Sequence, residues 1–243
     1  MNVTAIASDL DGTLTNRIGI LNLDALKKIR LLEKSKIPVI IVSGQNIHSA
    51  RTLSYYMGAS TLTVAENGGV ISYWFLKPLV LGSRKPAEEA LETLKEKFGD
   101  KIRTTLNAEL RLRDITLQKR FSIHLAREYL KGKHDDVKLM DSGFVYHVID
   151  KTISKGAGLK EAIKLYNSQE NIHNPIDIEG VISIGDANND LDLLKATKYG
   201  IALRHAPKEL KEVASYVTKK RYGKGFVEAI EHVVKKFDIT LKG

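Results

Sequence analysis

The sequence predicts an α/β protein in which a Rossmann-like parallel sheet, covered by helices, is interrupted by an α+β insert. Apolar runs of strand length alternate with amphipathic segments of helix length in residues 1–81 and again in residues 152–243, a pattern typical of βαβ units. Residues 82–151 instead contain two helix-like segments and a hairpin, which favour antiparallel strands. We therefore expect a core domain of residues 1–81 and 152–243, and a cap domain of residues 82–151.

The first core segment is expected to contain four strands and two helices. Asn22 is a typical N-cap for the first helix, and Gly58 is a typical residue to end the second. A Glu-Asn-Gly-Gly turn at 66–69 separates the last two strands. The strands are expected at 3–8, 39–42, 61–65 and 70–75, and the helices at 23–34 and 46–57.

The insert and the second core segment follow in the same way. In the insert, Gly143 offers the positive φ that a hairpin turn needs. Its helices are expected at 86–99 and 120–131, and its strands at 111–118, 137–140 and 144–149. In the second core segment, helices are expected at 155–166, 191–196, 207–213 and 225–236, and strands at 181–184 and 200–203.

The composition excludes several classes of protein. The 243 residues include no cysteine, which removes disulfide scaffolds, thiol nucleophiles and zinc-thiolate sites. Apolar runs such as 39–42 are far shorter than the roughly 20 residues of a membrane span. Asp9 and Asp11 interrupt the place where a signal peptide would have its apolar region. We expect a cytoplasmic protein without a membrane partner.

The net charge of +9 has two interpretations, a nucleic-acid footprint or a solvated surface that also attracts small anions. Most lysines fall on the polar faces of expected helices or alternate with glutamates, as in residues 92–97, and no basic stripe with interleaved aromatics is present. The pattern favours the solvated surface and predicts no nucleic-acid partner. A basic nucleic-acid-binding protein is the alternative from another functional class, and it requires strongly salt-dependent binding.

Two pairs of acidic residues each follow an apolar strand. Asp9 and Asp11 come after the first expected strand, and Asp186 and Asp190 come after the strand expected at 181–184. Ligands of open parallel sheets bind beyond the carboxyl ends of the strands, so the two pairs are expected to converge there. Close carboxylates repel each other unless a cation lies between them, and Mg²⁺ prefers carboxylate, water and phosphate oxygens. The four acids predict a magnesium site.

Four other residues are predicted to bind a phosphate group. Ser43 and Gly44 follow a buried strand and offer a hydroxyl and a backbone N–H. Lys155 stands at the start of a helix, where the helix dipole already favours anions. Asn189, inside the second acidic cluster, either touches the substrate or caps a helix.

Together, these motifs resemble those of the haloacid dehalogenase superfamily of aspartate-nucleophile phosphatases. The pattern of that superfamily is DxDG[TV], then Ser or Thr, then Lys, then GDxxxD, and the four elements occur here in the same order. The insert lies between the second and third elements, where members of that superfamily with a C2-type cap carry it, and it is most similar to a C2B cap. The stretches 42–45 and 65–71 are most similar to archaeal-type phosphoglycolate phosphatases, although those usually have Asn in place of Gln45. The matching residues are Asp9 to Thr13, Ser43, Lys155 and Gly185 to Asp190.

The resemblance implies hydrolysis through an aspartyl-phosphate, with Mg²⁺ as the cofactor. Asp9 is the implied nucleophile, and Asp11 is the implied acid and base. The implied metal ligands are Asp9, the main-chain carbonyl of Asp11, Asp186 and Asp190. The implied phosphate-binding residues are Ser43, Gly44, Lys155 and Asn189.

The expected partner is a small phosphate ester, with 2-phosphoglycolate as the first candidate. A sugar-phosphate phosphatase or a phosphomutase on the same scaffold stays open, because specificity lies in cap side chains. Arg111, Arg113 and His147 are candidates for binding a substrate carboxylate, although solvated positions explain them equally well. The sequence is also compatible with a homodimer.

Overall fold

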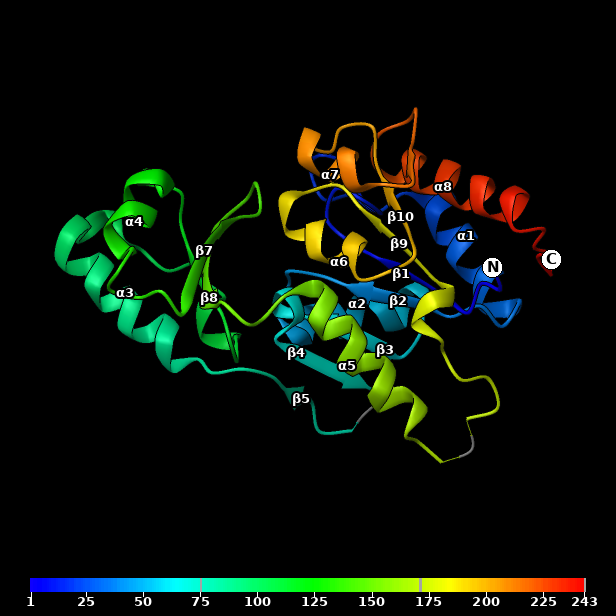
Figure 1. The fold of residues 1–243 in the computed structure, drawn as a ribbon, viewed down its shortest axis with the longest axis horizontal. Helices are drawn as coiled ribbons and strands as arrows, with labels where there is room; N and C mark the ends of the chain where they lie inside the picture. The colour runs from blue at the N-terminus through cyan, green and yellow to red at the C-terminus, as the bar shows by residue number, and fades with distance from the viewer. Residues whose placement is uncertain (75, 171, 243) are drawn as a thin grey trace.

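The computed structural model describes residues 1–74, 76–170 and 172–242, and Figure 1 shows a large sheet with a smaller lobe beside it. The large sheet has the order β11-β10-β9-β1-β2-β3-β4-β5, parallel from β11 to β3 and antiparallel at β4 and β5. The predicted α/β class is therefore confirmed. The strands are β1 (Ala5–Ser8), β2 (Val39–Val42), β3 (Leu62–Ala65), β4 (Val70–Tyr73), β5 (Leu79–Val80), β9 (Val181–Gly185), β10 (Tyr199–Ala202) and β11 (Tyr216–Val217).

Helices cover both faces of this sheet, which explains why its central strands are continuous apolar runs. Along β1, Ile6 packs with α1 and α8 on one face, whereas Ala5 and Ala7 pack with α5 and α6 on the other. The alternation follows from the two-residue period of a strand. The helices of the core are α1 (Leu23–Lys34), α2 (Ile47–Met57), α5 (Lys155–Asn167), α6 (Leu191–Lys195), α7 (Lys208–Val213) and α8 (Tyr222–Lys236).

The smaller lobe is a three-stranded antiparallel sheet packed against two helices (Figure 1). Its apolar side chains form a hydrophobic cluster of their own. Gly143 has φ +88° in the β7–β8 hairpin, as the turn requires. The lobe has the strand order β6-β8-β7, with β6 (Ile115–Leu117), β7 (Val137–Asp141) and β8 (Tyr146–Asp150), and the helices α3 (Lys85–Phe98) and α4 (Ile123–Leu130).

Several element boundaries differ from the expected ones. The strand expected at 111–118 is reduced to β6, because the backbone N–H groups of Leu112 and Arg113 donate to the carboxylate of Glu66 instead of to a neighbouring strand. The short edge strands β5 and β11 were not expected, and α8 begins three residues early, at Tyr222. Phe75, the expected end of the fourth strand, lies outside the described residues. In the described part of the chain, every helix is too short or too polar to cross a membrane.

The partly buried carboxyl group of Glu33, near the end of α1, is expected to make the stability of the protein depend on pH. Its carboxylate accepts the Val39 N–H at 2.6 Å, and burial raises the pKa of Glu33 to about 7. The folded state therefore binds more protons than the unfolded chain between about pH 4.5 and pH 7, and the free energy of unfolding falls as pH rises through this range. In Glu33→Gln, which keeps the acceptor, we expect this fall to be smaller.

The measurement is urea denaturation of both proteins from pH 4.5 to pH 8. Glu92→Gln is the matched control, because Glu92 is exposed on α3 and pairs only with Lys95 among the described residues. The free energy of unfolding of this control should change with pH in the same way as that of the wild type. The same pH dependence in Glu33→Gln would contradict the raised pKa of Glu33.

Candidate active site

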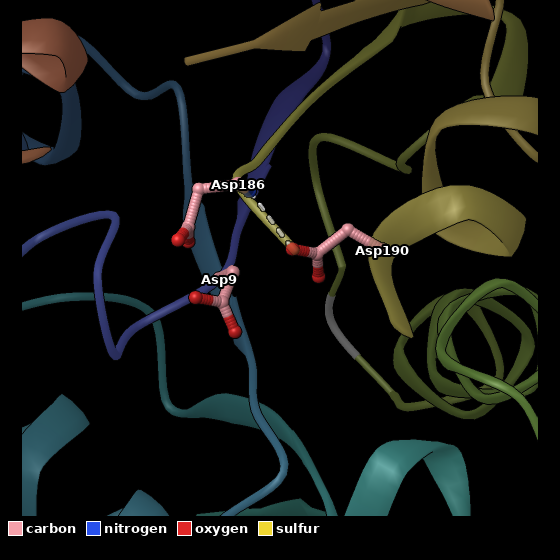
Figure 2. Close-up of side chains that lie close together, drawn as sticks. All are labelled: Asp9, Asp186 and Asp190. Atoms are coloured by element: carbon pink, nitrogen blue, oxygen red, sulfur yellow. Dashed lines mark hydrogen bonds between the residues drawn. The ribbon is translucent and has the colours of Figure 1, made fainter. Parts of the chain in front are cut away.

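The predicted acids and the predicted serine meet at one edge of the sheet. Asp9 follows β1, Ser43 follows β2 and Asp186 follows β9, and these three strands are parallel neighbours. Their carboxyl ends therefore lie side by side, at the point where open sheets bind ligands. Figure 2 shows Asp9, Asp186 and Asp190 directed toward one another from β1 and from the loop after β9.

Lys155 joins the two acidic segments. Its side chain is only 1% exposed, and its Nζ lies 2.6 Å from Asp9 Oδ1 and 2.6 Å from Asp190 Oδ1. Burial raises the pKa of Asp9 well above its ordinary value, with further increases from the neighbouring carboxylates, while Lys155 lowers it. Burial alone would lower the pKa of Lys155, but Asp190 and Asp9 outweigh burial and raise it. The ammonium group therefore stays charged and holds Asp9 in place.

Asp190 accepts hydrogen bonds on both carboxylate oxygens. Oδ1 accepts from Lys155, and Oδ2 accepts from the backbone N–H groups of Asp186 and Ala187, each at 2.9 Å. Figure 2 shows the bond between Asp186 and Asp190. These two N–H bonds close the turn that follows β9. The geometry thus gives Asp190 two tasks, shaping the loop that carries Asp186 and orienting Lys155.

Asp186 is the partly exposed member of the acidic cluster. Thr13 donates to its Oδ1 at 2.6 Å, and His205 Nε2 lies 3.1 Å from its Oδ2. Ligand atoms of Asp9, Asp186 and Asp190 all lie within 4.8 Å of one another. Three carboxylates with one lysine leave a net negative site, and carboxylate oxygens are the donors that Mg²⁺ prefers. The residues present therefore fit a magnesium ion.

Asp11 lies apart from that cluster. Its Oδ2 accepts from Gln45 Nε2 at 2.9 Å, and both side chains line a cavity of about 840 Å³ together with Asp9. Ser43 is fully buried, and its Oγ accepts from the Gln45 N–H; no acceptor for its hydroxyl proton is found in the described part of the chain. Gln45 thus connects the loop after β2 to Asp11.

The cavity lies between the core and the smaller lobe. Gly44 and Asn189 line its core side, as do the acids Asp9 and Asp11. Lys155 and Ser43 lie behind this surface and are not among the lining residues. The smaller lobe contributes Thr105, Leu106, Asn107, Arg111, Thr116, Gln118, Ser142, Phe144, Val145 and His147.

Asn67, in the turn after β3, is a further site residue, whereas the sequence predicted only a turn at this position. Its Oδ1 accepts from Asn189 Nδ2 at 3.0 Å, and a Cβ on Gly44 would come within 3.1 Å of the same oxygen. Asn67 has φ +56°, a conformation that asparagine tolerates better than most residues. The sequence feature that could have predicted this role is an asparagine followed by two glycines. No sequence feature predicts the role of Glu66, which binds the backbone of residues 112 and 113, because these partners belong to the distant insert.

Comparison with known proteins identifies the family. A family model described as haloacid dehalogenase-like hydrolase matches residues 6–109 and 118–230. A relative from Archaeoglobus fulgidus, named phosphoglycolate phosphatase, is 36% identical over 228 residues, which cover 93% of this chain and 95% of the relative. A relative of the same name from Methanobrevibacter smithii is 36% identical over 241 residues, which cover 96% of this chain and 100% of the relative.

Solved structures show the same fold. The crystal structure of Thermoplasma acidophilum 0175 superposes with a TM-score of 0.83 at 20% identity and covers 99% of this chain and 100% of its own. A haloacid dehalogenase-like hydrolase from Bacteroides thetaiotaomicron superposes with a TM-score of 0.74 at 18% identity, covering 96% of this chain and 100% of its own. The resemblance stated from the sequence is thereby confirmed: this chain belongs to the haloacid dehalogenase-like hydrolases, and among them to the phosphatases.

Proposed function

We propose that the protein hydrolyses a small phosphomonoester in the presence of Mg²⁺, and that this substrate is 2-phosphoglycolate, released as glycolate and phosphate. The observation that carries the proposal is the position of Asp9. Its carboxylate borders the cavity while Lys155 holds it from behind at 2.6 Å. A carboxylate fixed in this way presents one oxygen to an incoming phosphorus atom.

The proposed reaction has two steps. In the first, an Asp9 oxygen forms a bond to phosphorus, the bond from phosphorus to the ester oxygen breaks, and Asp11 gives its proton to that oxygen. In the second, Asp11 takes a proton from water, the water oxygen attacks the aspartyl-phosphate, and phosphate leaves with Asp9 restored. Ser43, Gly44 and Asn189 are proposed to bind the phosphate oxygens, and Lys155 to offset their charge.

The metal is proposed to be held by Asp9, Asp186 and the main-chain carbonyl of Asp11. When bound, Mg²⁺ supplies positive charge that offsets the negative charge of the phosphate and of the acidic cluster. We assign Asp190 a positioning role, because it is fully buried and its oxygens accept from the Lys155 ammonium and from two backbone N–H groups, whereas Asp186 is partly exposed. Support for Mg²⁺ comes from the donor set and the family, and support for 2-phosphoglycolate comes from the names of the relatives.

Phosphate release from 2-phosphoglycolate tests the proposal directly. We expect turnover with Mg²⁺, none with EDTA, and recovery when Mg²⁺ is added back in excess, because the acidic cluster repels a phosphate dianion without the ion. We also expect Mg²⁺ to raise the melting temperature in the absence of substrate, since an ion that binds only the folded state stabilises it. Full turnover in EDTA would contradict the metal requirement.

The same assay separates the alternatives. Preferred turnover of a sugar phosphate would replace the proposed substrate, and an isomerised phosphate ester without free phosphate would indicate a phosphomutase. Salt-dependent binding of DNA or RNA without any turnover would favour the nucleic-acid-binding protein. We further propose a cytoplasmic location, supported by the absence of cysteine, and light scattering would decide between a monomer and a homodimer.

A further inference from the structure

Of the three cap residues that are candidates for binding a carboxylate, Arg111 is already occupied. Its Nη1 donates to Asp114 Oδ1 at 2.5 Å, its Nη2 donates to the main-chain oxygen of Gly44 at 2.8 Å, and its side chain is 7% exposed. Asp114 is fully buried and neutralises the guanidinium. Arg111 therefore ties the cap to the core.

Arg113 is directed elsewhere. Its Nε donates to the main-chain oxygen of Leu81 at 2.8 Å, and its Nη1 donates to that of Leu112 at 2.9 Å. It is not among the residues that line the cavity. Its contacts hold the segment where the chain passes from the core into the cap.

The third candidate is His147, whose ring has a hydrogen-bond partner at one of its two nitrogens. Its Nδ1 lies 2.5 Å from Asp114 Oδ2, so the ring carries a proton on Nδ1 and donates it to the carboxylate. Burial would raise the pKa of Asp114, but the hydrogen bond and charge of His147, together with Arg111, lower it. The ring lines the cavity, and its Nε2 has no hydrogen-bond partner within the described ranges.

We propose that His147 Nε2 binds the carboxylate of the substrate and that Asp114 is its positioning residue. Asp114 balances the guanidinium of Arg111, and the hydrogen bond from Nδ1 to Asp114 fixes the orientation of the ring. An N–H group at Nε2 then donates to the substrate carboxylate. This wall of the cavity is almost fully buried, and a hydrogen bond to a charged group is strong in such a site. This inference rests on the proposed function, since it presumes an ester that carries a carboxylate.

The position of His147 suits a short substrate. Asn67 Nδ2 donates to Asp114 Oδ2 at 3.5 Å, the oxygen that also accepts from His147 Nδ1, and Asn67 Oδ1 accepts from Asn189, a proposed phosphate ligand. Arg111 contacts the main chain of Gly44, the other phosphate-binding position on that side. Only a few hydrogen-bonded groups thus separate the phosphate site from Nε2, which fits a phosphate and a carboxylate joined by a single carbon.

The test compares two esters that differ in one group, 2-phosphoglycolate and 2-hydroxyethyl phosphate, in which a hydroxymethyl group replaces the carboxylate. We expect the wild type to prefer 2-phosphoglycolate in kcat/KM. In His147→Asn, which keeps a donor for Asp114 but leaves nothing at Nε2, we expect kcat/KM for 2-phosphoglycolate to fall about 10- to 100-fold, the range of one charge-assisted hydrogen bond. For 2-hydroxyethyl phosphate we expect a change below about 3-fold, the same hydrogen bond being absent.

His124→Asn, on the exposed face of α4, is the matched control and should leave both values unchanged. His147→Gln, which places a neutral amide near Nε2, should keep an intermediate preference and guards against a folding defect in His147→Asn. An unchanged preference in both His147 variants would overturn the inference and leave the proposed function intact. Arg17 lines the core side of the same cavity, and loss of the preference in Arg17→Met alone would overturn the inference by assigning the carboxylate to Arg17. A wild type without any preference would refute the proposed substrate and the inference together.

Discussion

Asp9→Asn is expected to abolish phosphate release, with kcat reduced by about 10⁴-fold or more, as for removal of other nucleophiles. The amide has nearly the same shape as the carboxylate, but its oxygen is a poor nucleophile and cannot form the aspartyl-phosphate. The measurement is phosphate release from 2-phosphoglycolate with saturating Mg²⁺. Asp24→Asn on α1 is the control, because Asp24 is exposed and contacts only Lys27 among the described side chains; it should retain wild-type turnover.

A covalent intermediate separates this mechanism from direct attack by water. The substrate for this test is p-nitrophenyl phosphate labelled in its phosphoryl group, because its leaving group needs no acid. We expect Asp11→Asn to complete the first step and to accumulate protein that carries the labelled phosphoryl group, since the second step lacks its base. The combined variant Asp9→Asn/Asp11→Asn should acquire no label. Turnover that persists in Asp9→Asn, or label that persists in the combined variant, would rule out Asp9 as the nucleophile.

Lys155→Met is expected to lower both stability and activity. The substitution leaves Asp9 and Asp190 without their shared cation in a buried site, and breaking a buried ion pair from one side costs about 3–5 kcal/mol. We expect this loss in urea denaturation at pH 7 in EDTA. Added Mg²⁺ should raise the melting temperature of Lys155→Met more than that of the wild type, because the ion then offsets more uncompensated negative charge.

Lys85→Met is the matched control, since Lys85 on α3 is exposed and faces Glu89 at 3.7 Å. An exposed pair of this kind contributes about 0–1 kcal/mol. If Lys155→Met unfolded at the same urea concentration as Lys85→Met, the two bonds to Lys155 would not stabilise the fold. A stable variant that nevertheless lost activity would restrict Lys155 to substrate binding.

The sequence by itself determined the class of fold and the place of the acids. Continuous apolar runs indicated strands buried on both faces, and Asp9, Ser43 and Asp186 each came directly after one of them. Parallel strands end at the same edge of a sheet, so local patterns along the chain sufficed to predict that these residues meet. The hairpin of the insert was predictable for the same reason, because its turn is encoded by adjacent residues.

Only the tertiary structure decided which partner each charged group has. Lys155 and Asp9 are 146 positions apart, and Asn189 and Asn67 are 122 apart. Hydrogen bonds over such separations depend on how the cap and the core pack, which no local pattern encodes. For this reason the sequence left Arg111, Arg113 and His147 equivalent, and Asp190 indistinguishable from Asp186, whereas the packed structure gives each a different set of contacts.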